Sequence, residues 1–122
     1  MKFRWVVVFV MAMPLSSFSA TGLYRGMDFF QARQKIINQG WVPYKTHHDF
    51  VKEGEDGFPY SGIERRLINR GVVEISGCSL GKTSCVFYYS KAGKCFLLET
   101  DGENVSQLKL FYWGMRSCPE LE

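Results

Sequence analysis

Apolar and polar residues alternate through the second half of the chain in a pattern that predicts a β-sheet. Four short runs rich in β-branched and aromatic residues are separated by turn signals. We therefore expect four consecutive antiparallel strands, over residues 72–76, 85–90, 95–100 and 105–112. The connections at 91–94 and 101–104 contain glycine and are short enough for tight hairpin turns.

The first half of the chain has helical periodicity instead. Apolar residues recur at three- and four-residue intervals after Asp28, which predicts a helix over residues 29–38 that Asp28 caps and Gly40 ends. Ser61 and Glu64 match the S-x-x-E capping box, in which the glutamate side chain reaches back to the N-cap. This motif predicts a second helix that ends near residue 69.

The segment between the helices is extended at its start, because Pro43 disfavours helical backbone at Val42. Residues 41–44 fit either an edge strand or a lid over the core, and residues 45–60 form a loop without clear periodicity. The order helix, loop, helix and strands predicts an α+β fold. We expect two helices packed on one face of a four-stranded antiparallel meander, stabilised by two disulfides.

The first nineteen residues have the layout of a secretory signal peptide. Lys2 and Arg4 precede nine apolar residues at 5–13, and Pro14 and a small-residue region follow. Nine apolar residues are too few to span a bilayer, although a retained N-terminal anchor helix is the alternative. We expect cleavage after Ser19, with cleavage after Ala20 as the second choice. The folded part is then a single α+β domain over residues 20–122.

Removal of this leader changes the charge balance. The full chain of 122 residues has 15 basic and 12 acidic residues and a net charge of +3. Without Lys2 and Arg4 the balance is 13 against 12, or about +1. No basic excess then remains that would indicate binding to nucleic acid or to an anionic membrane.

Four cysteines in an exported chain predict two disulfides, because the compartment outside the cytoplasm is oxidising. Zinc binding is disfavoured because the cysteine spacings contain no C-x2-C pair. Of the three possible pairings we expect Cys78–Cys85, which flank one connection between strands, and Cys95–Cys118, which lie at the start of one strand and after the next.

Two motifs suggest chemistry but do not satisfy its requirements. The segment 77–83 (GCSLGKT) has three residues between its glycines, where a phosphate-binding loop has four, and a predicted strand follows it instead of a helix. His47 and His48 are adjacent, so their side chains diverge, and no third ligand recurs at a helical spacing. We therefore predict no cofactor and no metal.

The sequence also lacks a recognisable catalytic set. Both histidines lie in the loop at 45–60, and the cysteines are expected to be oxidised, so no nucleophile has an evident base. The acidic residues Glu53, Glu55 and Asp56 read as a solvated charge run. We predict that the protein is not an enzyme, with a small hydrolase that uses paired carboxylates as the open alternative.

Aromatic side chains lie on both sides of the strand at 85–90. Val86 and Tyr88 share one side and Phe87 and Tyr89 the other, because side chains alternate along a strand. The side that the helices leave uncovered is a candidate contact surface. Tyrosines that only reinforce cross-strand packing are the equally weighted alternative.

The chain resembles a group of small exported proteins of Gram-negative bacteria. The shared residues are Ala32-Arg33, Gly40-Trp41-x-Pro43, Cys78 and Cys85-x-Phe87-x-Tyr89, followed by a glycine turn at Gly93, a strand that ends in Thr100, and Gly102-Glu103. The resemblance implies a bacterial envelope protein but supplies no activity. The layout of helices over a disulfide-bearing sheet is also similar to one repeat of the beta-lactamase inhibitor protein, which is a likeness of fold only.

From these observations we expect a periplasmic or secreted binding module without enzymatic activity, for instance an inhibitor or an immunity-type protein. Its partner would be another exported protein. The residues expected to make contact are Trp41, Tyr44, Phe58, Tyr60 and Tyr88. The alternative function is a factor for maintenance or assembly of the cell envelope that contacts lipid or peptidoglycan.

Overall fold

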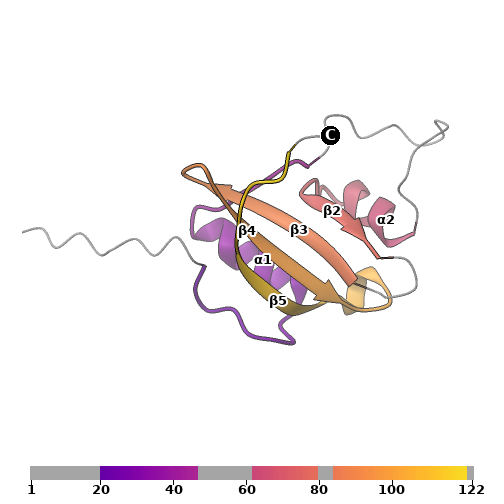
Figure 1. The fold of residues 1–122 in the computed structure, drawn as a ribbon. Coiled ribbons are helices and arrows are strands. Elements are labelled where there is room, and N and C mark those ends of the chain that lie inside the picture. The colour runs from indigo at the N-terminus through magenta and orange to yellow at the C-terminus, as the bar shows by residue number, and fades with distance from the viewer. Residues whose placement is uncertain (1–19, 47–61, 80–83, 121–122) are drawn as a thin grey trace, which may run out of the picture.

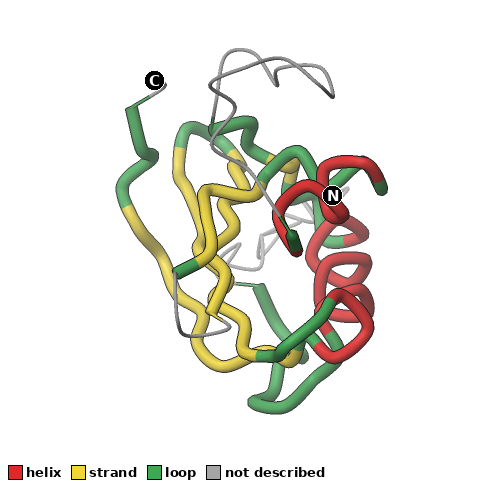
Figure 2. The backbone as a smooth tube through the Cα atoms, turned by 90° about the vertical axis from the view of Figure 1, so that its right-hand side faces the viewer, coloured by secondary structure: helices red, strands yellow, loops and turns green. Residues whose placement is uncertain are grey.

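The computed structural model describes residues 20–46, 62–79 and 84–120. Within them two helices lie on one side of an antiparallel sheet (Figures 1 and 2), which confirms the expected α+β class. The expected signal peptide at 1–19, both histidines, the contact residues Phe58 and Tyr60, and residues 80–83 lie outside the described residues.

Helix α1 spans Phe29–Asn38, as its apolar periodicity predicts. The Asp28 side chain accepts a hydrogen bond from the Gln31 backbone N–H at 3.1 Å, so it caps one of the free amides at the helix start. Gly40 follows the last turn with φ 93°, a left-handed conformation that glycine adopts without steric cost. Phe29, Ala32 and Ile36 are the buried face of this helix.

Helix α2 spans Ile63–Asn69, but its start differs from the predicted capping box. Its N-cap is Gly62, without a side-chain hydrogen bond, and Ser61 lies outside the described residues. The Glu64 carboxylate accepts from the backbone N–H of Cys78 at 3.2 Å. Glu64, which the capping motif assigned to the start of the helix, therefore also makes a tertiary contact with β2.

The sheet has five strands, in the order β1-β3-β4-β5, with β2 also paired to β3. The strands are β1 (Val42–Pro43), β2 (Ile75–Cys78), β3 (Ser84–Lys91), β4 (Lys94–Asp101) and β5 (Lys109–Arg116). Four of them follow the expected meander. The segment at 41–44, for which two interpretations were open, contributes the short edge strand β1, which pairs with β3 at Ser90 and Tyr89.

Two predicted strands are displaced along the chain. The first begins at Ile75 and not at Val72, and the fourth begins at Lys109 and not at Val105. A short 3-10 helix, η1 (Val105–Gln107), takes the place of the start of the fourth strand. The Ser106 hydroxyl donates to the Asn104 side chain at 2.6 Å, and the Gln107 N–H donates to the Asn104 carbonyl at 3.0 Å. These local hydrogen bonds compete with extended backbone.

The turn between β3 and β4 forms where it was predicted. Ala92 and Gly93 have φ values of 51° and 77°. Positive φ at both central residues is characteristic of a type I′ turn, whose twist matches that of the flanking strands. This turn fixes the register of β3 against β4, with Tyr89 opposite Phe96 and Phe87 opposite Leu98.

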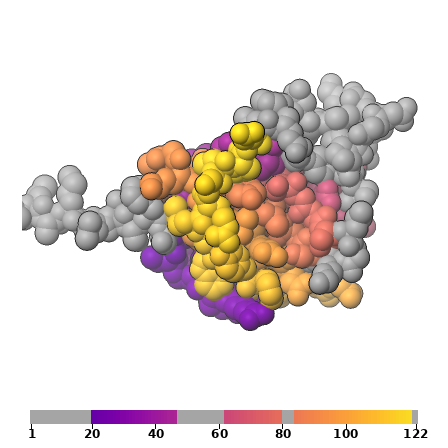
Figure 3. Space-filling view, viewed as in Figure 1, coloured from indigo at the N-terminus to yellow at the C-terminus, as the bar shows by residue number. Residues whose placement is uncertain are grey.

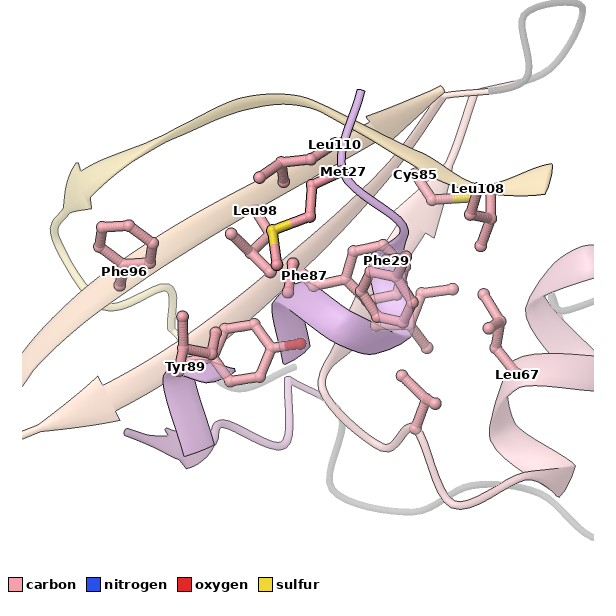
Figure 4. Packing of buried hydrophobic residues seen from close by; sticks show 14 of the residues in the cluster. Met27, Phe29, Leu67, Cys85, Phe87, Tyr89, Phe96, Leu98, Leu108 and Leu110 are labelled. Carbon is pink, nitrogen blue, oxygen red and sulfur yellow. The ribbon is translucent and has the colours of Figure 1, made fainter. Parts of the chain in front are cut away.

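The core lies between the helices and the inner face of the sheet (Figure 4). The Phe29 and Phe87 rings stack with centroids 4.2 Å apart, and Leu67 from α2 packs into the same cluster. Tyr89, Phe96 and Leu98 extend the cluster along the sheet toward α1. The alternation of the strands thus buries one face, as the sequence pattern predicts.

Both disulfides pair as predicted. Cys78 and Cys85 lie directly opposite each other on β2 and β3, with Cα atoms 4.0 Å apart. Cys95 on β4 is bonded to Cys118 beyond the end of β5, with Cα atoms 4.9 Å apart. The first bond joins two neighbouring strands, and the second holds the C-terminal segment against the sheet.

Candidate functional site

The sheet has a second face that the helices do not cover. Phe87 and Tyr89 point into the core, so the alternate residues of β3, Val86 and Tyr88, point to the opposite side. Across the sheet this outer face continues with Leu97 and Glu99 on β4 and Tyr112 and Arg116 on β5. The outer face lies toward the viewer in Figures 1 and 3, where yellow β5 runs beside the orange strands.

The β5 part of this face is a row built from residues two apart, Tyr112, Gly114 and Arg116. The Tyr112 side chain lies over Gly114, because a Cβ atom at Gly114 would be only 3.1 Å from the Tyr112 hydroxyl. The Arg116 guanidinium donates to that hydroxyl at 2.7 Å and lies 5.2 Å from the ring centroid. Glycine therefore provides the space for the ring, and arginine fixes its position.

The centre of the outer face is formed by β3 and β4. Tyr88 lies opposite Leu97, and Val86 lies opposite Glu99. Leu97 points to the outer face and is only 7% exposed. Glu99 accepts a hydrogen bond from the Ser84 hydroxyl at 3.2 Å. The centre thus contains the apolar residues Val86 and Leu97, and the Glu99 carboxylate lies directly opposite Tyr112 of the β5 row.

The C-terminal segment crosses one end of this face. The disulfide of Cys118 attaches the segment to Cys95, whose side chain points to the outer side. Farther along, the Tyr44 hydroxyl donates to the Pro119 carbonyl at 3.0 Å. Tyr44 itself is placed by its backbone N–H, which donates to the Tyr88 carbonyl at 2.9 Å. These contacts connect the segment from β5 across to the β1 edge.

The structure separates the contact residues that the sequence grouped together. Tyr88 lies half-buried on the outer face, and Tyr44 lies half-buried at its border. Trp41 is a core residue, 2% exposed, with its ring 5.3 Å from that of Phe96 and 5.9 Å from the Lys91 ammonium. We therefore omit Trp41 from the candidate surface. Its burial follows from the tight turn at Gly40, after which the Trp41 N–H donates to the Ile36 carbonyl.

A buried charged pair links α1 to the segment before β2. The Arg33 guanidinium donates to Glu74 at 2.6 and 3.2 Å, and Glu74 is completely buried. Burial opposes the charge on Arg33, but the hydrogen bonds and charge of Glu74 prevail and raise the pKa of Arg33. Because the Arg33 guanidinium and the Glu74 carboxylate pair with each other, we assign this pair to the stability of the fold and not to the candidate site.

Tyr89 belongs to the same buried region. Its hydroxyl makes no well-formed hydrogen bond to any described residue. Burial, and secondarily the nearby Glu74 carboxylate, raise the pKa of Tyr89 well above its usual value. The hydroxyl therefore stays protonated and inaccessible, and it is not a candidate general base.

No protein-family model, no curated protein and no solved structure matches this chain. Among the described residues, no group of three or more histidine, cysteine, aspartate or glutamate side chains is arranged to hold a metal ion. The helices in the described part of the chain are too short or too polar to cross a membrane.

Sequence reasoning missed Tyr112, Gly114 and Arg116 as one feature. The predicted strand ended at residue 112 and put Tyr112 on the same side as Leu110. In the structure Leu110 opposes Thr100 and Tyr112 opposes Glu99, so Phe111 is an extra residue in a β-bulge. The bulge turns Tyr112 outward while Leu110 stays in the core. The consecutive aromatics at 111–113 were the one signal that a strict alternation fails there.

Proposed function

We propose that this protein is an exported binding module that recognises another exported protein through the outer face of its sheet. The observation that carries the proposal is the row of Tyr112, Gly114 and Arg116, in which an exposed tyrosine is held in place by an arginine. Tyrosine and arginine are the residues most enriched where protein interfaces gain their binding energy.

The face also has the mechanical properties that a binding surface needs. Its side chains project from hydrogen-bonded strands and not from long loops, and a disulfide fixes the C-terminal segment at one end. Side chains that are already ordered lose less conformational entropy when a partner binds. Tyr88 and Tyr112 are the aromatic residues expected to contribute most.

Export is the second part of the proposal. It rests on the layout of residues 1–19 and on the two disulfides, which are typical of proteins that fold in an oxidising compartment. Trapping of thiols at lysis followed by intact-mass measurement tests this part. The expected product lacks residues 1–19 and contains no alkylated cysteine.

The binding surface is tested by capture of partners from the periplasmic fraction of the native cell with a C-terminally tagged protein. We expect one stoichiometric protein partner. Tyr88→Ala and Tyr112→Ala should each weaken this complex by about thirtyfold or more, because interface hot spots contribute at least about 2 kcal/mol. Tyr24→Ala is the matched control, because Tyr24 is also an exposed tyrosine but lies beside α1 and not on the outer face.

Circular dichroism and thermal unfolding of each variant distinguish binding from folding. Loss of the fold in Tyr88→Ala would assign that residue to the core and remove it from the proposed surface. Equal binding by wild type, both outer-face variants and the control would refute the outer face as the contact site. Recovery with membranes or peptidoglycan and without a protein partner would favour the envelope-factor function.

A further inference from the structure

The strand β5 has one edge that is only partly occupied. Its first residues pair with the segment before α1, where the Leu110 N–H donates to the Met27 carbonyl and the Leu110 carbonyl accepts from the Gly26 N–H, both at 2.7 Å. Beyond this point, from Phe111 to Arg116, no described segment pairs with the outward side of β5.

The directions of the backbone groups follow from the register. Tyr88 directs its N–H to Glu74 and its carbonyl to Tyr44, so it faces away from β4. The backbone groups of its neighbours Phe87 and Tyr89 therefore bond to β4. Because the bonding direction alternates along each strand, the backbone groups of Leu97 and Glu99 on β4 then bond to β5.

The backbone N–H and C=O groups of Tyr112 and Gly114 consequently point toward β4, and those of Trp113 and Met115 point away from β4 to the free edge. No described backbone group bonds to the Trp113 or Met115 N–H. The Met115 carbonyl accepts from its neighbour Arg116 at 3.0 Å.

The exposed side chains around this edge are aromatic and cationic. Phe111 is 45% exposed, and the Arg25 guanidinium lies 4.5 Å above its ring. Arg116 lies at the other end, beside Tyr112. Neither arginine forms an ion pair with any described carboxylate, whereas Lys109 lies 4.0 Å from Asp28. Two cations with no acidic partner among the described residues thus flank roughly 20 Å of strand that no described segment pairs with on this edge.

Two shallow hollows lie near the ends of the same stretch. One, of about 210 Å³, is lined by Arg25, Phe111, Tyr112 and Trp113. The other, of about 340 Å³, includes Lys94, Met115 and Arg116. Side chains of an added strand project at regular intervals to both faces of the sheet, where such hollows receive them.

We propose that an extended acidic segment of the partner protein pairs with β5 between Phe111 and Arg116 as an additional strand of the sheet. This inference rests on the proposed binding function and specifies how the partner docks. The free backbone groups supply the pairing, and Arg25 and Arg116 select for acidic side chains. The aromatic row of the outer face lies directly beside the added strand.

The same charges argue against a second copy of this chain as the occupant. Antiparallel pairing of two β5 strands about a two-fold axis at Trp113 would place Arg116 of one copy near Arg25 of the other. Like charges brought together in this way repel each other. An acidic partner makes the same two positions attractive.

The test uses random twelve-residue peptides displayed on phage and selected against the oxidised wild-type protein. We expect the selected peptides to be rich in Asp, Glu and β-branched residues and free of proline. Their synthetic versions should bind about tenfold more weakly to Met115→Pro, which lacks the outward N–H. Arg25→Ala should also weaken binding, and Arg66→Ala, which removes an exposed arginine on α2, should not.

Hydrogen exchange followed by NMR gives a readout that needs no variant. In the free protein the Trp113 and Met115 amides should exchange faster than those of Tyr112 and Gly114, which face β4. A selected peptide should protect the Trp113 and Met115 amides specifically. Failure to select any peptide, equal binding to Met115→Pro when that variant is folded, or unchanged exchange at these two amides would each overturn strand addition.

Failure of strand addition is distinguishable from failure of the proposed function. Peptides or partners that lose affinity with Tyr88→Ala but not with Met115→Pro or Arg25→Ala would place the contact on the outer face alone. In that outcome the binding module stands and the added strand does not. Binding that no variant of either surface changes would refute both.

Discussion

The buried pair of Arg33 and Glu74 gives a prediction whose size follows from the structure. Replacement of Arg33 by Met leaves the Glu74 carboxylate buried without its two hydrogen bonds to the guanidinium. Breaking a buried ion pair costs about 3–5 kcal/mol of unfolding free energy. The Arg33 side chain is 22% exposed, so water can approach the vacated position, and we expect the lower value, about 3 kcal/mol.

This loss is large relative to the total stability of a domain of this size, which is about 5–15 kcal/mol. It corresponds to a decrease in Tm of about 12–24 °C, which thermal and urea unfolding followed by circular dichroism would detect. Arg66→Met is the control, because Arg66 is exposed on α2, and we expect it to change the stability by less than about 0.5 kcal/mol.

A double variant distinguishes the ion pair from simple packing. Arg33→Met combined with Glu74→Leu removes both charges, so much of the stability lost in Arg33→Met should return. Equal destabilisation by Arg33→Met and Arg66→Met would refute the structural role of the pair. A double variant less stable than Arg33→Met would show that the pair contributes through its shape and not through its charges.

Three further predictions concern the core, the disulfides and one turn. Because the pKa of Tyr89 is raised, the folded protein keeps a proton that the unfolded chain loses near pH 10, so stability falls above about pH 10. In urea titrations between about pH 9 and 11, Tyr89→Phe should therefore lose less stability than wild type. A difference between the two proteins that does not change with pH would contradict this. Replacing Cys95 and Cys118 with Ser opens the longer loop and should lower the free energy of unfolding by about 3.5 kcal/mol, whereas the same change at Cys78 and Cys85 should lower it by about 2.5 kcal/mol. The reverse order in urea unfolding would refute the loop-entropy argument. Gly102 has φ 151°, and a Cβ atom there would collide with the Gln107 carbonyl. Gly102→Ala should therefore lower the free energy of unfolding by more than about 2 kcal/mol. An unchanged Tm would show that this turn rearranges to accept the methyl group.

The sequence predicted those parts of the fold that local signals determine. Helix α1 has its cap, its apolar periodicity and its glycine stop within a dozen residues, and its bounds agree with the structure. The type I′ turn at Ala92 and Gly93 likewise depends on neighbouring residues alone. The disulfide pairing followed from the strand order, because antiparallel neighbours bring the start of one strand close to the end of the next.

Other features depend on contacts between distant residues. Glu64 bonds to Cys78 across fourteen positions, a contact that the local capping motif does not predict. The bulge at Phe111 reverses the direction of Tyr112, and no alternation rule would place it there. Trp41 and Tyr44 are three residues apart, yet one lies in the core and the other at the border of the outer face. Tyr88 and Tyr89 were correctly put on opposite sides of the sheet because β3 alternates without interruption, whereas which side the helices cover was left open.

The internal contacts and the exposed aromatic surface occupy different regions of the described part of this chain. The Arg33 and Glu74 pair and the disulfide of Cys78 and Cys85 connect a helix, the segment before β2 and two strands, and all of their charge and bonding is used internally. A catalytic site needs a titratable group that can reach a substrate. Among the described residues, Glu74 is paired with Arg33 and the Tyr89 hydroxyl is buried, whereas Tyr112 and Arg116 are fixed by their mutual hydrogen bond and exposed on the outer face. A rigid sheet that exposes fixed aromatic and cationic side chains next to an unpaired edge can recognise a partner without any further rearrangement of its own backbone.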